Sequence, residues 1–175
     1  MYVNDLVITG NNKKIVASII KQLGDRFSLK DMGLLHFFLG VEVIPTPARL
    51  FLSQHKYIRE LLSNTNMSSA KDVSTPLSTT QSLKLLDGTT NVDNTKFPRI
   101  IGSLQYLSLM HPNISFVVNK LSQFMHKPTT THFTTTKRLF RYLKQTIFHG
   151  IQLTKFGPPT LITYSDVDWA GNIDD

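Results

Sequence analysis

The architecture depends most on residues 98–146, which read PRIIGSLQYLSLMHPNISFVVNKLSQFMHKPTTTHFTTTKRLFRYLKQT. Apolar side chains recur along this stretch at the three- and four-residue spacing of a helix face. Pro112 and Pro128 divide it, because proline is favoured in a first helical turn and ends the helix that precedes it. The pattern therefore predicts three helices, over residues 98–109, 112–125 and 130–146, packed as a small bundle.

Strand-like segments flank this bundle on both sides. There are five such segments, which are rich in β-branched and aromatic residues: residues 2–8, 35–44, 50–52, 150–154 and 161–164. Gly40 predicts a bulge or bend within the second segment, and Pro45 and Pro47 end it. Residues 50–52 are then expected to form its hairpin partner.

Two further helices and a connector are expected before the bundle. Asn11 or Asn12 caps the first helix, which is predicted to end at Gly24, and Ser53 caps the second. Residues 64–95 are polar and show little periodicity, so they predict a long connector that contains an internal boundary. The expected fold class is α+β.

Positive charge is concentrated in one part of the chain. The 175 residues carry a net charge of +7, but residues 94–165 contain nine basic side chains and no Asp or Glu. Four of these cations, Lys137, Arg138, Arg141 and Lys144, lie in one predicted helix, where Lys137, Arg141 and Lys144 share a face. A segment without carboxylates favours binding to a phosphate backbone, with strong salt dependence. A basic face that serves only solubility is the alternative.

The composition argues against several classes of protein. The sequence has no cysteine, no secretory signal and no apolar run long enough for a membrane helix. It also lacks a nucleophile elbow, a phosphate-binding loop and a dinucleotide fingerprint. Its six histidines do not have the spacing of a zinc site, so they are expected at the surface or facing nucleic acid. We therefore expect an intracellular protein with no membrane partner and no small-molecule cofactor, in a compartment that the sequence does not specify.

Acidic side chains at two predicted strands are the candidate metal ligands. Asp5 lies in the first strand-like segment, and Asp166 and Asp168 follow the last one. Carboxylates at strand ends can bind paired divalent cations for phosphoryl transfer, provided that several converge. Taken alone, each cluster fits a turn or a helix cap equally well.

The ordered motifs of the chain resemble those of copia-type retrotransposon reverse transcriptases, especially the plant ones. The similar segments extend over nearly the whole chain, and they are YVNDLVITG at residues 2–10, FSLKDMG at 27–33, LHFFLGVEV at 35–43, LSQHKYI at 52–58, IGSLQYL at 101–107, PNISF at 112–116, KLSQFM at 120–125, residues 137–144, and YSDVDWAG at 164–171. We therefore identify the chain as a member of this family.

The resemblance implies a division of the chain into four parts. Residues 1–50 would be a partial palm with a primer-grip-like hairpin, in which Phe38, Leu39 and Gly40 resemble the grip turn. Residues 51–96 would be a thumb helix and connector, 97–148 a basic thumb and connection bundle, and 149–175 the start of a ribonuclease H domain. The rest of the polymerase would lie upstream of Met1, and the ribonuclease H domain would continue past Asp175. The implied partner is an RNA/DNA primer–template duplex, bound also by Lys137, Arg138, Arg141 and Lys144.

The resemblance also implies Mg²⁺ as the cofactor, with Asp5 and Asp166 as remnants of the two catalytic sites. Asn4 occupies the position of the principal metal-binding Asp of the family motif. A neutral amide oxygen holds Mg²⁺ poorly, so the chain is expected to bind the metal weakly and to be inactive alone. Three functions stay open: a polymerase part completed in trans by the upstream segment, a duplex-binding module, and a mobile-element relic without a selected role.

Overall fold

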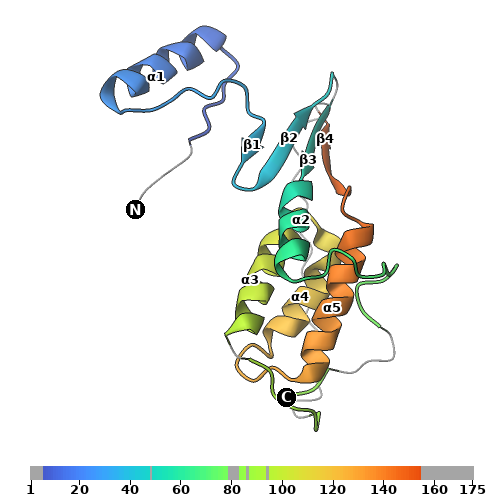
Figure 1. Ribbon diagram of the computed structural model, residues 1–175. Helices are drawn as coiled ribbons and strands as arrows, with labels where there is room; N and C mark the ends of the chain where they lie inside the picture. Colours follow the sequence, from blue (N-terminus) through green and yellow to red (C-terminus); the bar gives the residue numbers. More distant parts are fainter. Residues whose placement is uncertain (1–5, 48, 79–82, 86, 94, 155–175) are drawn as a thin grey trace, which may run out of the picture.

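The described residues of the computed structural model are 6–47, 49–78, 83–85, 87–93 and 95–154. They form an α+β fold in which a small antiparallel sheet lies at one end of a helical bundle (Figure 1). The elements follow in the order α1 (Lys13–Arg26), β1 (Phe37–Phe38), β2 (Val41–Pro45), β3 (Arg49–Ser53), α2 (His55–Asn64), α3 (Lys96–Ser108), η1 (Pro112–Ile114), α4 (Ser115–Ser122), α5 (Thr130–Gln145) and β4 (Gly150–Thr154). The predicted fold class is thus confirmed.

Two of the predicted strands lie wholly or mostly outside the described residues. The strand expected at residues 161–164 lies outside the described residues, as does most of the one expected at residues 2–8. Residues 6–8, the described end of the latter segment, are not in a strand.

A tight turn joins β1 to β2, where the sequence predicted one strand with a bend. Leu39 and Gly40 both have positive φ, 46° and 77°, and Phe38 pairs directly with Val41. A two-residue loop with two positive φ angles is a type I′ turn, whose twist matches that of an antiparallel hairpin. Gly40 supplies conformational freedom at the second position, so the chain reverses there instead of bending.

The fourth strand comes from the far end of the described chain. β4 pairs antiparallel with β3, from Ser53 opposite Gly150 to Arg49 opposite Thr154. The strand order is β1-β2-β3-β4, so β4 extends the sheet that begins with the hairpin of β1 and β2. The division proposed at residue 149 stays a prediction, but the strand that follows it belongs to the same sheet as residues 49–53.

The bundle has one continuous hydrophobic core. Ile58, Leu61 and Leu62 of α2 pack with residues of α3, α4 and α5, including the fully buried Phe97 and Leu104. Leu83, in the connector, is also only 3% exposed and belongs to this core. The connector therefore does not separate two cores, although the boundary expected within it stays a prediction.

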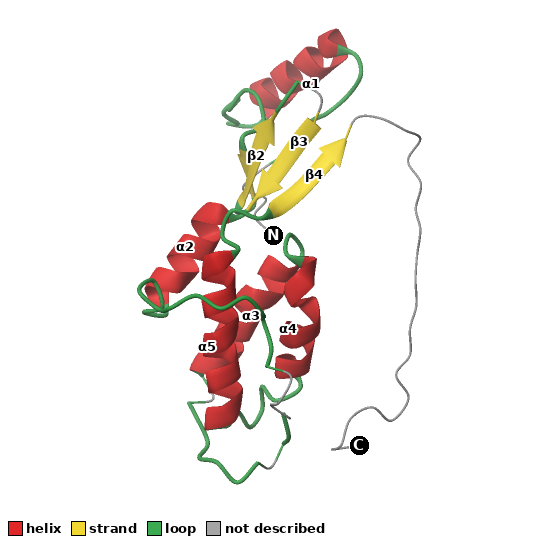
Figure 2. Ribbon diagram, turned by 90° about the vertical axis from the view of Figure 1, so that its right-hand side faces the viewer, coloured by secondary structure: helices red, strands yellow, loops and turns green. Residues whose placement is uncertain are grey.

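Helix α1 stands apart from this core. Asn12, one of the two predicted caps, caps it, because its side-chain oxygen accepts hydrogen bonds from the backbone N–H groups of Lys14 and Ile15, at 3.0 and 3.3 Å. None of the helix residues is buried, and Ile15 is 57% exposed. Figures 1 and 2 show α1 at the side of the sheet away from the bundle. No helix in the described ranges has the length and apolar content needed to cross a membrane.

Candidate nucleic-acid interface

The candidate metal ligands predicted from the sequence lie outside the described residues. Asn4 and Asp5, like Asp166 and Asp168, are outside the described residues. Within the part of the chain that is described, no group of three or more His, Asp or Glu side chains could hold a metal ion. The two remnant metal sites therefore stay predictions based on the family motif.

The grip-like turn lies against the bundle. A Cβ at Gly40 would be 3.1 Å from the hydroxyl of Tyr106 in α3, and the Tyr106 ring packs edge-on against Tyr57 of α2 at 5.2 Å. Phe38 is half-buried, while the Leu39 side chain is 60% exposed at the tip of the hairpin. The turn thus presents Leu39 to solvent from a position fixed by two helices.

Three of the four cations predicted to bind phosphates are already bonded to the connector, which crosses α5 (Figure 2). Each donates to an oxygen of residues 70–75: Arg141 Nε to the Lys71 carbonyl at 2.5 Å, Lys144 Nζ to the Ala70 carbonyl at 2.8 Å, and Arg138 to Thr75 Oγ1 at 2.7 Å. Lys144 also lies 3.4 Å from an Asp72 carboxylate oxygen. We call Arg138, Arg141 and Lys144 the connector-binding cations. Oxygens of the connector are their partners in the structure, where the sequence predicted phosphate groups.

Lys137 has a different environment from these three residues. It lines a cavity of about 620 Å³ between α2, α3 and α5, together with Lys96 and Arg99 of α3. No Asp or Glu is among the described residues that line it. Its Nζ lies 5.1 Å from the centre of the Phe133 ring, a cation–π contact that holds the ammonium group at the wall. We call Lys96, Arg99 and Lys137 the basic cleft.

The basic cleft was only partly visible in the sequence. Lys96 and Arg99 counted among the nine cations of the acid-free segment, but neither was singled out as a site residue. Their spacing of one helical turn on α3 was the available signal. Lys96 Nζ also lies 3.9 Å from a carboxylate oxygen of Asp93, but the Lys96 side chain is 79% exposed and such a surface pair is weak, so its ammonium group stays open to another anion.

Two histidines correct the expectation that all six lie at the surface or face nucleic acid. His132 is fully buried, and its Nδ1 accepts a hydrogen bond from the Thr129 backbone N–H at 3.0 Å, which completes a capping box for α5. Its ring also stacks on Phe124, with ring centres 4.1 Å apart. His111 is 1% exposed in the turn between α3 and η1. The Thr129-x-x-His132 spacing was the signal that could have identified the first of them.

His111 should make the stability of the protein depend on pH. Burial, and to a lesser extent the charge of His149, lowers the pKa of His111 below the usual value of a histidine. The unfolded chain therefore binds this proton more readily than the folded one. This contribution to the free energy of unfolding is complete above about pH 6.5, the usual pKa of a histidine. It is lost as the pH decreases from there to the lowered pKa of the folded state, by at most about 1.4 kcal/mol per pH unit.

Urea denaturation at pH 7.5 and 5.5 measures this contribution. The wild-type chain should lose stability at the lower pH, and His111→Phe should lose less, since the variant has no proton to bind at this position. An unchanged pH dependence in the variant would contradict the assignment to His111.

The comparisons with known proteins agree with the motifs of the sequence. The family model described as "Reverse transcriptase (RNA-dependent DNA polymerase)" matches residues 1–79. Over its full length the chain is 48% identical to the retrovirus-related Pol polyprotein from transposon RE1 of Arabidopsis thaliana, and 46% identical to that from transposon RE2 of the same plant. It is also 41% identical, over 98% of its length, to an uncharacterized mitochondrial protein of Arabidopsis thaliana, of which it covers 71%. No solved structure matches the chain.

These matches identify the class of protein. The chain belongs to the reverse transcriptase family, as found in the Pol polyproteins of plant retrotransposons. It spans about 12% of the length of the RE1 and RE2 polyproteins. The resemblance drawn from the sequence is thereby confirmed at the level of the family.

Proposed function

We propose that this chain binds an RNA/DNA primer–template duplex through the phosphate backbone, as the duplex-holding part of a copia-type reverse transcriptase. The observation that carries the proposal is the basic cleft, where Lys96, Arg99 and Lys137 surround a cavity without an acidic lining residue. The duplex is inferred as the partner from the family, and the positive charge of the cleft would bind its phosphate groups.

The chemistry of the cleft fits phosphate groups better than base edges. Arg99 can bind a phosphate through two parallel N–H groups, and the two lysines add point charges around the same cavity. The polar Asn64 lies at the wall of the cavity and can donate to a further phosphate oxygen. Such contacts position a duplex without selecting its sequence. We therefore expect weak sequence preference and a strong dependence on salt.

The grip-like turn would provide a second contact with the duplex. Leu39 projects from a type I′ turn, and Gly40 lets the backbone of the hairpin approach Tyr106 closely. An exposed apolar side chain on a tight turn fits the sugar face of a nucleic-acid strand. The connector-binding cations would contribute less, because their present partners must be exchanged before they reach a phosphate.

We further propose that the 175-residue chain does not polymerise by itself. The family motif implies Mg²⁺, but Asn4 offers a neutral oxygen where the motif has a carboxylate, so the donor set does not fit tight binding of this ion. Completion in trans by an upstream polymerase segment would leave that substitution in place. The chain would then hold the duplex while lacking the charge needed at the polymerase site.

Fluorescence anisotropy of a labelled blunt RNA/DNA duplex, measured at several salt concentrations, tests the proposal. Replacing Lys96, Arg99 and Lys137 with Gln should weaken binding at least about tenfold at low salt. It should also reduce the slope of log affinity against log salt by about 3, one unit for each lost phosphate contact.

The matched control replaces Arg138, Arg141 and Lys144 with Gln, which removes the same number of positive charges. This variant should keep most of the duplex affinity and lose thermal stability, because its side chains hold the connector on α5. Equal loss of affinity in both variants would show that net charge, not the basic cleft, determines binding. Absence of duplex binding by the wild-type chain at low salt would overturn the proposed function.

A further inference from the structure

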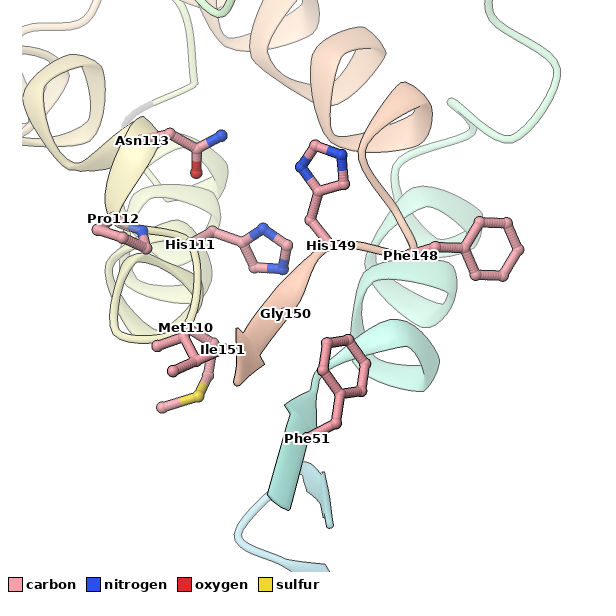
Figure 3. A pocket seen from close by; sticks show the side chains of 9 residues that line it. All are labelled: Phe51, Met110, His111, Pro112, Asn113, Phe148, His149, Gly150 and Ile151. Carbon is pink, nitrogen blue, oxygen red and sulfur yellow. The ribbon is translucent and has the colours of Figure 1, made fainter. Parts of the chain in front are cut away.

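The connector-binding cations are a concentration of positive charge separate from the basic cleft. Arg138, Arg141 and Lys144 are spaced three residues apart, so they form a row along one side of α5. A second cavity, of about 400 Å³ at the junction of the sheet and the bundle, has no Lys or Arg among the described residues that line it (Figure 3). That cavity offers no countercharge to an anion, whereas the row on α5 does.

One hydroxyl group of the connector lies directly against this row. Arg138 donates from Nη2 to Thr75 Oγ1 at 2.7 Å, and Thr75 is exposed. Arg141, one turn further along α5, donates to a backbone carbonyl of the same connector segment. The Thr75 hydroxyl is therefore an exposed, modifiable group held beside two guanidinium groups.

The present acceptors of the two arginines carry no charge. Arg138 is bonded to a hydroxyl oxygen and Arg141 to a carbonyl oxygen, and α5 itself contains no Asp or Glu. A hydrogen bond from a guanidinium group is roughly twice as strong when its acceptor is ionised. A phosphate group at this position would therefore bind the arginines more strongly than the present acceptors do.

The connector around Thr75 has the form of a kinase substrate. Residues 71–78 contain no helix or strand, and none of residues 70–75 is buried, so this segment can lift from α5 without exposing core. Pro76 follows Thr75 and favours an extended backbone at the threonine. A threonine followed by proline is the sequence that proline-directed protein kinases modify.

A second threonine followed by proline provides an internal comparison. Thr46 precedes Pro47 and is also exposed. Its hydroxyl is used inside the turn between β2 and β3, where it donates to the Arg49 carbonyl at 2.8 Å and accepts from the Arg49 backbone N–H at 3.1 Å. A phosphate on Thr46 would disturb that turn, whereas a phosphate on Thr75 would meet the connector-binding cations.

We propose that Thr75 is a phosphorylation site for a proline-directed protein kinase, and that Arg138 and Arg141 bind the phosphate. Thr75 Oγ1 forms a bond to the γ-phosphorus of ATP while the bond from that phosphorus to the β–γ bridging oxygen breaks. ADP leaves, and the hydroxyl proton passes to a base of the kinase. The product carries about −1.5 to −2 charges at pH 7 and three acceptor oxygens, which fasten the connector to α5.

The test of phosphate binding compares the full chain with and without phosphothreonine at position 75, introduced during translation. The modification should raise the midpoint of thermal unfolding by roughly 4 °C, as expected for a new charge-assisted hydrogen bond. The same modification should give no rise in a variant with Arg138→Gln and Arg141→Gln, each form being compared with its own unmodified chain. No rise in the wild-type background, or an equal rise in both, would overturn the proposal.

Phosphorus NMR gives a readout that does not depend on the folding of the variant. The pKa of a phosphothreonine is about 6, and it should be lower in the folded chain than in the same chain unfolded in urea. The reason is that nearby guanidinium groups favour the doubly charged phosphate. Equal pKa values in the two states would contradict binding by the arginines.

The kinase step is tested on the unmodified folded chain. Incubation with ATP and a purified proline-directed kinase, followed by peptide mapping in a mass spectrometer, should show phosphate on Thr75. Thr46→Ala should keep this modification and Thr75→Ala should lose it. If a free peptide of residues 69–78 is modified while Thr75 of the chain is not, the site is inaccessible and the proposal is wrong. No nucleic acid takes part, so these outcomes are independent of the proposed function.

Discussion

Gly150→Ala should detach β4 from the sheet. A Cβ at Gly150 would lie 2.2 Å from the Leu52 carbonyl oxygen and 2.6 Å from Cζ of Phe51, distances that neither the backbone of β3 nor the ring can tolerate. The two strands must therefore move apart, with loss of pairing along β4. We expect a loss of about 3 kcal/mol in the free energy of unfolding, at the upper end of the usual cost of overpacking.

Hydrogen exchange measures where this loss occurs. The amides of β3 and β4 should exchange much faster in Gly150→Ala, while those of the bundle core keep their protection. The control is Gly102→Ala within α3, where an added Cβ would meet no atom within 4 Å. That variant should gain roughly 0.5–1 kcal/mol from the higher helix propensity of alanine. Unchanged exchange in β3 and β4 of Gly150→Ala would show that the strands accommodate the methyl group.

Phe97→Ala should have the largest effect on the bundle. Phe97 is fully buried in the first turn of α3 and belongs to the core shared by α2, α3, α4 and α5. Truncation of a buried phenylalanine to alanine costs about 3–5 kcal/mol, because the cavity it leaves is only partly refilled. Since the whole stability of a domain is about 5–15 kcal/mol, we expect a large decrease in the urea midpoint, or failure to fold at 37 °C.

The effect should reach the binding of nucleic acid. Lys96 and Arg99 flank Phe97 on α3, so a loosened first turn would displace two of the three cations of the basic cleft. The control for stability is Phe116→Ala, which removes the same side chain from an exposed position on α4 and should change the midpoint little. Similar decreases of the urea midpoint in the two variants would contradict the assignment of Phe97 to the core.

The helices could be predicted from the sequence because their signals are local. Apolar periodicity and the two prolines gave the three bundle helices to within a few residues, and Asn12 gave the start of α1. The sheet was harder to predict. Residues 150–154 were expected to be a strand, but nothing local indicates that it pairs with β3, about a hundred residues earlier, since pairing depends on the tertiary arrangement of the bundle between them.

The site was predictable in its charge and not in its geometry. The acid-free segment identified the basic region, and the apolar spacing along α5 is that of Leu139 and Leu143, which are both fully buried. Spacing could not show that Arg138, Arg141 and Lys144 face the connector, because their partners are carbonyl and hydroxyl oxygens of residues 70–75. Any residue type supplies a backbone carbonyl, so such partners leave little trace in a sequence.

The pairing of β3 with β4 also bears on the order in which the protein folds. Ser53 and Gly150 are neighbours in the sheet, and the chain between them contains α2, the connector and the whole bundle. Closing a loop of this length before the bundle exists would cost much chain entropy for few contacts. Once the helices have packed, the end of α5 and the start of α2 hold the two strands close together. We therefore expect the bundle to fold first and β4 to join the sheet late, so that pulling on the C-terminal side would release β4 before it disturbed the helices.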